Sequence, residues 1–373
     1  MSPVIDKVAL YYPRAMHGNG GVTNSLWLWA ESLQRAGVAV EVYYDPRLPT
    51  FRERVVPTGV RTRAVQHHGG GRFAVPRHLG RELDPSTLLV LHSGYVLFNI
   101  VAGEVARRCG IRYVVMPLGA YDPHVRASRR AARSVWEIAE RRLLKHALAV
   151  HVFFRPEIDH VRRLALTAAT VTAPTAFALP DTGWRQESTR DYVAWLGRYD
   201  VRHKGLDRLL DAMALLPPHR RPLLMLRGRD HKDSRSVIES MAVERGIAEH
   251  VSVGGSIDGS DKQRFLLEAA AYVHPARWES YGIALVENLA YGVPCLTTTD
   301  INLGPDLEEA GAALVVEGSA EGLARGLDAV AAGRLSSFGA RGREFVRERL
   351  SHEAAGGKFL SGIEALTRVE PVR

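Results

Sequence analysis

Cysteine, lysine and long apolar runs are all scarce in this sequence of 373 residues. Two cysteines, Cys109 and Cys295, are too few for a disulfide framework or a zinc knuckle. Apolar runs such as 88–91 fall far short of the ~18 residues that a transmembrane helix needs. The opening residues 1–7 lack the charged stretch and the apolar core of a signal peptide. We therefore expect a cytoplasmic protein.

The basic residues are nearly all arginine, and they are unevenly distributed. Lysine supplies six of the 49 basic residues. Residues 1–180 contain 24 Lys and Arg against 13 Asp and Glu, whereas residues 181–373 contain 25 against 28. A basic half can face nucleic acid, phosphate or a membrane. A general preference for arginine explains the excess equally well, so both interpretations stay open at this point.

Composition and periodicity predict two α/β domains. The 46% hydrophobic and 24% charged residues exclude disorder, collagen and coiled coil, and the length suits two domains of ~150 residues each. Apolar runs that read as strands alternate with helical stretches in both halves. The predicted strands are 7–12, 38–44, 88–91, 113–116, 148–154, 192–196, 222–226, 251–253 and 272–274. Such alternation is typical of parallel sheets covered on both faces.

The alternation lapses around residues 170–190, where Pro, Gly and Thr occur without periodicity. We interpret this stretch as a hinge that separates domains 1–180 and 181–350. Each half then reads as a Rossmann-like domain. Open parallel sheets bind ligands at the carboxyl ends of their strands, so we expect a ligand in a cleft between the two domains.

The most informative window is 274–294, which begins His-Pro and continues through Glu-Ser-Tyr-Gly to a second glutamate. Ser280 is a good N-cap, and Gly282 allows close backbone approach, so we expect a helix to begin here and to end at Gly292. Glu279 then precedes the helix and Glu287 lies about two turns inside it. Eight residues subtend ~80° on a helical wheel, so both carboxylates could reach one extended ligand.

This window resembles the Glu-x7-Glu signature of retaining glycosyltransferases of the GT-B fold, most closely glycosyltransferase family 4. Three further segments agree with the resemblance: Gly20-Gly21 after the first strand, Gly197-Arg198 followed by Lys204-Gly205, and the predicted strand 311–316. The resemblance implies two Rossmann-like domains with parallel sheets facing a cleft. It also implies that a terminal helix, about 351–373, packs back on the first domain.

The resemblance implies a role for each matching residue. Arg198 and Lys204 would hold the diphosphate of a nucleotide-sugar donor, Glu279 would contact the donor sugar near the reacting carbon, and Glu287 would bind the ribose. Gly20, Gly21 and the backbone N–H groups of Tyr281, Gly282 and Ile283 would complete the donor site. The predicted reaction is transfer to an acceptor hydroxyl with retention, in which the leaving phosphate takes the proton. No cofactor or metal is expected, since no Asp-x-Asp occurs in the sequence.

The first half departs from the family pattern at one position. Family members often carry a histidine in the first domain that faces the donor sugar, but here Leu118 stands in the corresponding stretch 116–123. Either His92 or His124 replaces it, or this chain functions without it. The candidate residues on the acceptor side are His92, Gly119, Tyr121 and His124.

A basic helix is expected near 126–146. Its cations are Arg126, Arg129, Arg130, Arg133, Arg141, Arg142 and Lys145. Either this is a solvated arginine-rich face, or it attracts anionic lipid head groups or a polyprenyl diphosphate acceptor, at ~1 kcal/mol per cation near a membrane. The resemblance favours a lipid-linked, sugar or small-molecule acceptor, and a location at the inner face of the plasma membrane.

Functions other than sugar transfer also fit parts of the sequence. A nucleotide-sugar epimerase or phosphorylase of the same fold is the second enzyme hypothesis. A basic nucleic-acid-binding protein is disfavoured, because the second half is net acidic and exposed aromatics are not interleaved with the arginines. A non-catalytic scaffold is disfavoured because both glutamates, Arg198 and Lys204 are all present.

Overall fold

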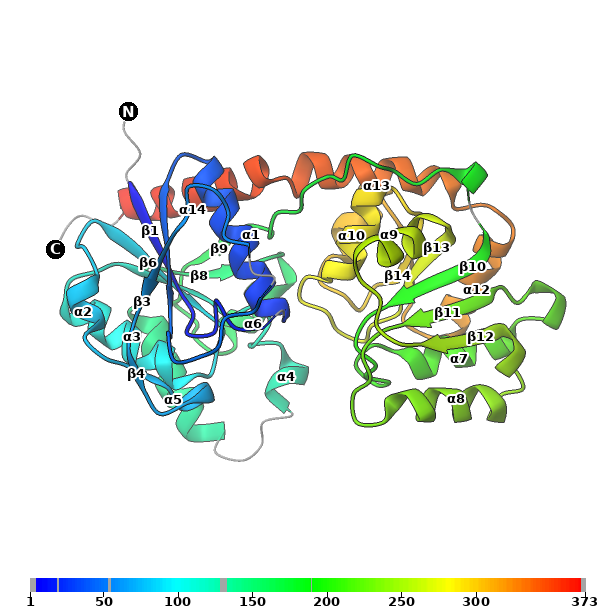
Figure 1. Cartoon of the computed structure of the whole chain (residues 1–373), viewed down its shortest axis with the longest axis horizontal. Coiled ribbons are helices and arrows are strands. Elements are labelled where there is room, and N and C mark those ends of the chain that lie inside the picture. Colours follow the sequence, from blue (N-terminus) through cyan, green and yellow to red (C-terminus); the bar gives the residue numbers. More distant parts are fainter. Residues whose placement is uncertain (1–4, 19, 53–54, 128–132, 189, 370–373) are drawn as a thin grey trace. The chain divides into compact units, whose positions relative to one another are not determined.

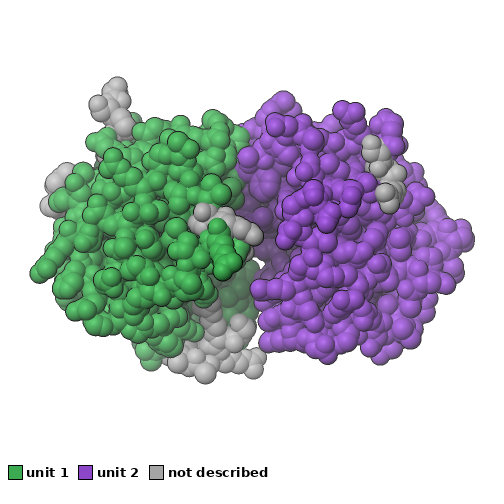
Figure 2. Space-filling view, in the orientation of Figure 1, with its two compact units in different colours: residues 1–176, 350–373 green, residues 177–349 purple. Residues whose placement is uncertain are grey.

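A computed structural model describes residues 5–18, 20–52, 55–127, 133–188 and 190–369. The chain divides into two compact units, coloured in Figure 2. Unit 1 comprises residues 1–176 and 350–373, and unit 2 comprises residues 177–349. In the part of the chain that is described, no helix is long and apolar enough to cross a membrane.

Unit 1 is built on a seven-stranded parallel sheet with the order β3-β2-β1-β6-β7-β8-β9. Its strands are β1 (Lys7–Tyr11), β2 (Ala39–Tyr44), β3 (Arg61–Ala64), β6 (Thr87–His92), β7 (Tyr113–Met116), β8 (Ala149–Val152) and β9 (Thr170–Thr172), and a separate antiparallel pair is formed by β4 (His67–His68) and β5 (Val75–Pro76). The central strands β1, β6 and β7 are mostly apolar, and every residue of β6 is buried, including Thr87 and His92. Burial on both sides is the usual state of a parallel sheet, because its connections place helices on both faces.

The helices of unit 1 include the last helix of the chain. They are α1 (Gly21–Arg35), α2 (Leu79–Glu82), α3 (Leu97–Arg108), α4 (Pro123–Ala127), α5 (Arg133–Lys145), α6 (Pro156–Arg162) and α14 (His352–Val369). The terminal helix α14 packs on α1 and β9 (Figure 1). Phe359 lies 5.3 Å from Trp29, centroid to centroid, and Ser32 Oγ is 3.0 Å from His352 Nδ1. Helix α14, which is distant in sequence from α1, therefore completes the hydrophobic core of unit 1.

Unit 2 contains a six-stranded parallel sheet with the order β12-β11-β10-β13-β14-β15. Its strands are β10 (Arg190–Leu196), β11 (Leu223–Arg227), β12 (Val251–Gly254), β13 (Ala269–His274), β14 (Cys295–Thr298) and β15 (Leu314–Val316). Its helices are α7 (Leu206–Leu215), α8 (Ser234–Glu244), α9 (Gly259–Leu267), α10 (Ile283–Tyr291), α11 (Gly304–Glu309), α12 (Ala320–Ala331) and α13 (Ser336–Arg349). Helices α7 and α12 pack together, as do α10 and α13.

Several predicted elements differ from the structure in their extent, and β9 lies at the start of the stretch 170–190 that was predicted as a hinge. The predicted basic helix near 126–146 corresponds to two helices, α4 and α5. Residues 128–132, which include two of its predicted cations, Arg129 and Arg130, lie outside the described residues. The predicted strand 311–316 is shorter, because β15 begins at Leu314. Gly311 has a φ of +57° just after α11, so the chain is still turning at that point.

Candidate functional site

Two loops of unit 2 leave the same edge of its sheet. Strands β10 and β13 are parallel neighbours, paired at Ala194 and Tyr272. The loop 197–205 follows β10, and the loop 275–282 follows β13. Because parallel neighbours end at a common edge, the Lys204 motif and the Glu279 motif lie side by side.

The residue after Lys204, Gly205, has a backbone conformation and a close contact that only glycine permits. It adopts a left-handed conformation with φ of +65°, and a Cβ placed there would lie 1.9 Å from the carbonyl oxygen of Pro275. Any other residue would collide with the neighbouring backbone as well as strain its own. The glycine therefore permits the direct contact between the two loops.

Lys204 and Glu279 meet at this contact. The ammonium of Lys204 donates to Oε2 of Glu279, and both side chains are largely buried, with 17% and 18% exposed. The Nε2 atom of buried His274 lies 3.7 Å from the same oxygen. Burial alone would raise the pKa of Glu279, but the charge of Lys204, with smaller contributions from the nearby His274, outweighs it and holds that pKa well below its usual value. Glu279 is therefore ionised at neutral pH.

Helix α10 begins later than predicted. It starts at Ile283 after Gly282, which has a φ of +77°, and no side chain caps it. The prediction of Ser280 as N-cap is thus wrong, because the left-handed Gly282 turns the chain into the helix instead. Within the described residues, the N–H groups of Gly282 and Ile283 have no hydrogen-bond partner. Such groups at a helix start suit the oxygens of a phosphate or a sugar.

Glu287 and Arg198 have partners of their own. Glu287 lies in α10, and its Oε1 is 2.5 Å from the ammonium of Lys262 in α9. Each glutamate of the signature is therefore paired with a separate lysine. Lys204 was predicted as a ligand of the diphosphate rather than as the partner of Glu279, and Lys262 was not predicted. Arg198 donates to Asp200 at 3.2 Å and is 41% exposed, so its guanidinium remains within reach of solvent.

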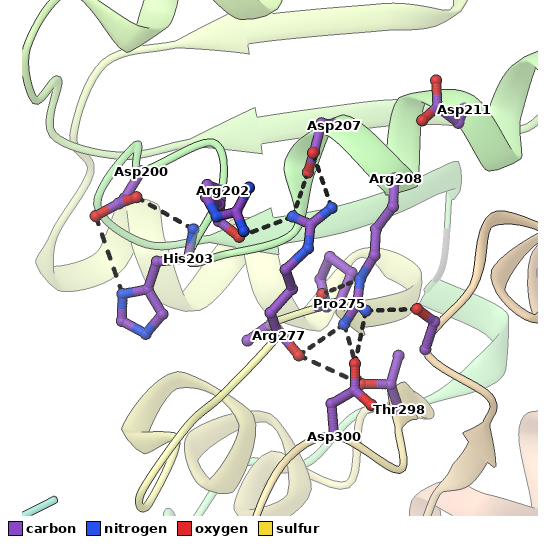
Figure 3. Close-up of polar contacts among 12 residues, drawn as sticks. Asp200, Arg202, His203, Asp207, Arg208, Asp211, Pro275, Arg277, Thr298 and Asp300 are labelled. Atoms are coloured by element: carbon purple, nitrogen blue, oxygen red, sulfur yellow. Dashed lines mark hydrogen bonds and ion pairs between the residues drawn. The ribbon is translucent and has the colours of Figure 1, made fainter. Parts of the chain in front are cut away.

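Behind this edge lies Arg208, a buried arginine that sequence reasoning missed (Figure 3). Its guanidinium donates to the carbonyls of Pro275 at 2.9 Å and Ala276 at 2.8 Å. It also donates to the carbonyl of Gly318 at 2.5 Å and to Asp300 at 2.6 Å. No periodic signal marks this residue, since it lies between the apolar positions of α7 and its partners are far along the chain.

A second arginine, Arg277, joins the two loops (Figure 3). It forms a two-pronged ion pair with Asp207 at 2.6 and 2.8 Å. It also donates to the carbonyl of Arg202 at 2.8 Å, and its own N–H donates to the carbonyl of His203 at 3.0 Å. The ring of His203 stacks on Trp278, with 4.5 Å between centroids. Arg277 stood inside the sequence window, but nothing there revealed its partner.

The glycines predicted for the donor site lie at the start of α1 in unit 1. Gly20 is the N-cap residue, and Gly21 is the first residue of the helix. A Cβ at either position would meet no atom within 4 Å, so packing within the unit does not demand a glycine there. Their open backbone is consistent with an approach by a ligand.

The acceptor-side candidates are unequally accessible in unit 1. Tyr121 is buried, and its hydroxyl donates to Glu140 at 2.6 Å. Gly119 follows Leu118 in a turn in which both have positive φ. His124 is 59% exposed and lies 3.1 Å from Asp122. Of these side chains, His124 alone is well exposed in unit 1.

His92 lies at the end of β6 with none of its surface exposed. Burial, with a smaller contribution from the nearby His151, lowers its pKa to about 3. Neither ring nitrogen has a hydrogen-bond partner within the described part of the chain. His92 is therefore a neutral core histidine in this structure, with no surface for a ligand to contact.

Comparison with known proteins places both units in one family. Residues 183–344 match the family model described as glycosyl transferases group 1, and residues 20–176 match the one described as glycosyl transferase 4-like domain. A phosphatidyl-myo-inositol mannosyltransferase of Mycobacterium leprae (strain TN) is 33% identical over 108 residues, which cover 28% of either chain. The matches span about a quarter of the length of the curated relatives.

Solved structures share the fold over nearly the whole chain. Sucrose-phosphate synthase from Thermosynechococcus elongatus has a TM-score of 0.75 at 20% identity, covering 98% of this chain and all of that one. The Anabaena protein Alr3699/HepE, solved with UDP and glucose, has a TM-score of 0.72 at 13% identity, covering 96% and 99%. The fold is GT-B. With a matching family model for each unit, the chain belongs to the GT4-type group 1 glycosyltransferases.

Proposed function

We propose that this protein transfers a sugar from a nucleoside diphosphate donor to an acceptor hydroxyl, with retention at the anomeric carbon and without a metal ion. The observation that carries the proposal is the pairing of Lys204 with an ionised Glu279 beside the start of α10. Family membership and a solved neighbour that binds UDP support a nucleotide donor.

Each group of the site has a task in this reaction. Lys204, the exposed guanidinium of Arg198 and the N–H groups of Gly282 and Ile283 would stabilise the negative charge of the departing diphosphate. Glu279 would stabilise the positive charge that develops at the anomeric carbon. Glu287 would accept hydrogen bonds from the ribose.

The bond changes in this reaction balance without a protein nucleophile. The acceptor oxygen bonds to the anomeric carbon on the face from which the phosphate departs, the bond from that carbon to the phosphate breaks, and the acceptor's proton passes to the phosphate. The protein cations take the part that a divalent ion would otherwise take, and the absence of Asp-x-Asp from the sequence supports this assignment.

Thermal denaturation with nucleotides tests the donor site. A bound ligand raises the melting temperature by mass action, so one of UDP, GDP, ADP or dTDP should stabilise the protein, and equally so in EDTA. Nuclear magnetic resonance of the product would then show the retained anomer. Loss of the shift in EDTA would contradict metal independence, whereas no shift with any diphosphate would contradict the donor site. Conversion of the donor sugar without transfer would favour an epimerase.

We further propose that α5 brings the protein to anionic membranes. Val135 and Ile138 are 71% and 69% exposed, and they share a helical face with the exposed Arg142. Exposed Arg141 and Lys145 flank this face. Apolar side chains beside cations are typical of helices that lie in the interface of an anionic bilayer.

Replacing Arg141 and Lys145 with glutamine should weaken binding to vesicles that contain phosphatidylglycerol by roughly tenfold or more, at ~1 kcal/mol per cation. Vesicle sedimentation measures this effect, and pure phosphatidylcholine vesicles show what remains without anionic lipid. A matched variant replaces two exposed arginines on other parts of unit 1, Arg162 and Arg61, with glutamine. Equal losses in both variants would mean that α5 has no special role.

A further inference from the structure

Contacts between the two loops of the donor site extend beyond Lys204 and Glu279. Asp207 pairs with Arg277, the carbonyls of Arg202 and His203 accept from Arg277, and His203 stacks on Trp278. The segments 202–208 and 275–279 are thus joined at several residues, and Figure 3 shows the contacts that Arg277 makes with Asp207 and Arg202. The arrangement of the two loops depends on these contacts as well as on the ion pair at the site.

The Asp207–Arg277 pair has the geometry of a strong interaction. The two terminal nitrogens of the Arg277 guanidinium donate to separate oxygens of the Asp207 carboxylate, and the side chains of Asp207 and Arg277 are 30% and 28% exposed. Paired N–H···O bonds of this kind fix orientation as well as distance. Asp207 lies in the first turn of α7, where the helix dipole favours a negative charge.

The position of the pair along the chain connects it to the donor site. Asp207 follows Lys204 by three residues, and Arg277 precedes Glu279 by two. Neither Asp207 nor Arg277 is bonded to Lys204 or Glu279 in the described structure. A change in the pair would therefore reach the site through the two short backbone segments.

We infer that Asp207 and Arg277 are positioning residues that hold the Lys204 loop against the Glu279 loop and so set the affinity for the donor diphosphate. This inference rests on the proposed function for its ligand, although the effect on the loops does not. A purely structural ion pair would stabilise unit 2 and leave nucleotide affinity unchanged, so the two roles can be separated.

Helix α7 supplies a matched control one turn further on. Asp211 pairs with Arg245 at 2.7 Å, with 47% and 23% of the two side chains exposed. It belongs to the same helix as Asp207, and its partner Arg245 follows α8 and is bonded to neither loop of the site. Asp207→Asn and Asp211→Asn each remove one carboxylate from one ion pair on α7.

The experiment titrates the full-length wild type and both variants with UDP and GDP by calorimetry. Asp207→Asn should weaken binding of the nucleotide that the wild type prefers by roughly tenfold, whereas Asp211→Asn should change it less than twofold. Both variants should melt within a few degrees of the wild type. Arg277→Lys, which keeps the charge but loses the planar fork, should weaken binding as well.

Hydrogen exchange without any ligand gives a second, independent measurement. In Asp207→Asn the hydrogen-bonded amides of Lys204, Gly205 and Arg277 should exchange at least fivefold faster than in the wild type, and in Asp211→Asn they should not. Equal affinities and equal exchange in the two variants would overturn the inference. If the wild type bound no diphosphate, the proposed function would fail, and the exchange rates would still decide whether the pair holds the loops.

Discussion

Replacing Glu279 with glutamine is expected to lower kcat/KM for sugar transfer by about 100-fold, which corresponds to ~2.7 kcal/mol of transition-state stabilisation. The substitution keeps the shape and removes the charge. The carboxylate is ionised at neutral pH, because Lys204 and His274 hold its pKa well below the usual value. A negative charge next to the anomeric carbon stabilises the transition state more than the ground state, so the loss should appear mainly in kcat.

Two further variants show whether the loss is specific to Glu279. Glu287→Gln should raise the KM for the donor more than it lowers kcat, because a ribose contact is similar in the ground state and the transition state. Glu239→Gln removes a half-exposed glutamate paired with Arg235 on α8 and should leave both constants unchanged. Steady-state kinetics with the donor identified by thermal denaturation measures all three variants. Wild-type rates in Glu279→Gln would show that the reacting carbon lies elsewhere.

Replacing Arg208 with methionine is expected to destabilise unit 2 by about 3–5 kcal/mol, as the loss of one partner from a buried polar network usually does. Methionine keeps much of the volume, but it leaves the carbonyls of Pro275, Ala276 and Gly318 without their charged donor. Water replaces the arginine at Asp300 more easily, because that side chain is 36% exposed. The loss therefore comes mainly from the orphaned carbonyls.

Urea denaturation of the full chain measures the free energy of unfolding. Hydrogen exchange of the amides of unit 1 and of unit 2 then shows in which unit stability is lost. Arg208→Lys should lie between the wild type and Arg208→Met, because one ammonium cannot reach all the acceptors. Asp300→Asn serves as the control and should cost much less, since the three carbonyls keep their donor. A loss below 1 kcal/mol in Arg208→Met would mean that water or a local shift satisfies these carbonyls.

Local sequence patterns predicted the elements well, because each pattern reports on burial. The alternation of apolar runs with helical stretches identified the central strands of both sheets. The ends of helices were predicted less well where the conformation of a single residue decides them. Ser280 has the chemistry of an N-cap, but α10 starts after the left-handed Gly282, whose backbone lies close to Glu279 and to His274 at the end of β13.

The candidate site was predictable only as far as its motif extends. Glu279, Lys204 and Glu287 stood out because their spacing and neighbours resemble those of a family. Lys262 carried no comparable signal. His274 and Arg277 stood inside the window, but the sequence did not reveal their contacts with Glu279 and with the Lys204 loop. The burial of His92 and Tyr121 was equally hidden, since neither spacing nor composition reveals that a polar side chain at the end of a strand, or in the turn that follows one, is covered.

The sequence by itself determined the fold class, the family resemblance and the two motifs of the donor site, because periodicity and spacing are properties of the chain read locally. The tertiary structure alone decided which charges meet. Arg208 finds its acceptors near residues 275, 300 and 318, and α14 completes the core formed around α1. Such partners are selected by burial, since a guanidinium removed from water must satisfy its donors wherever the fold supplies oxygens.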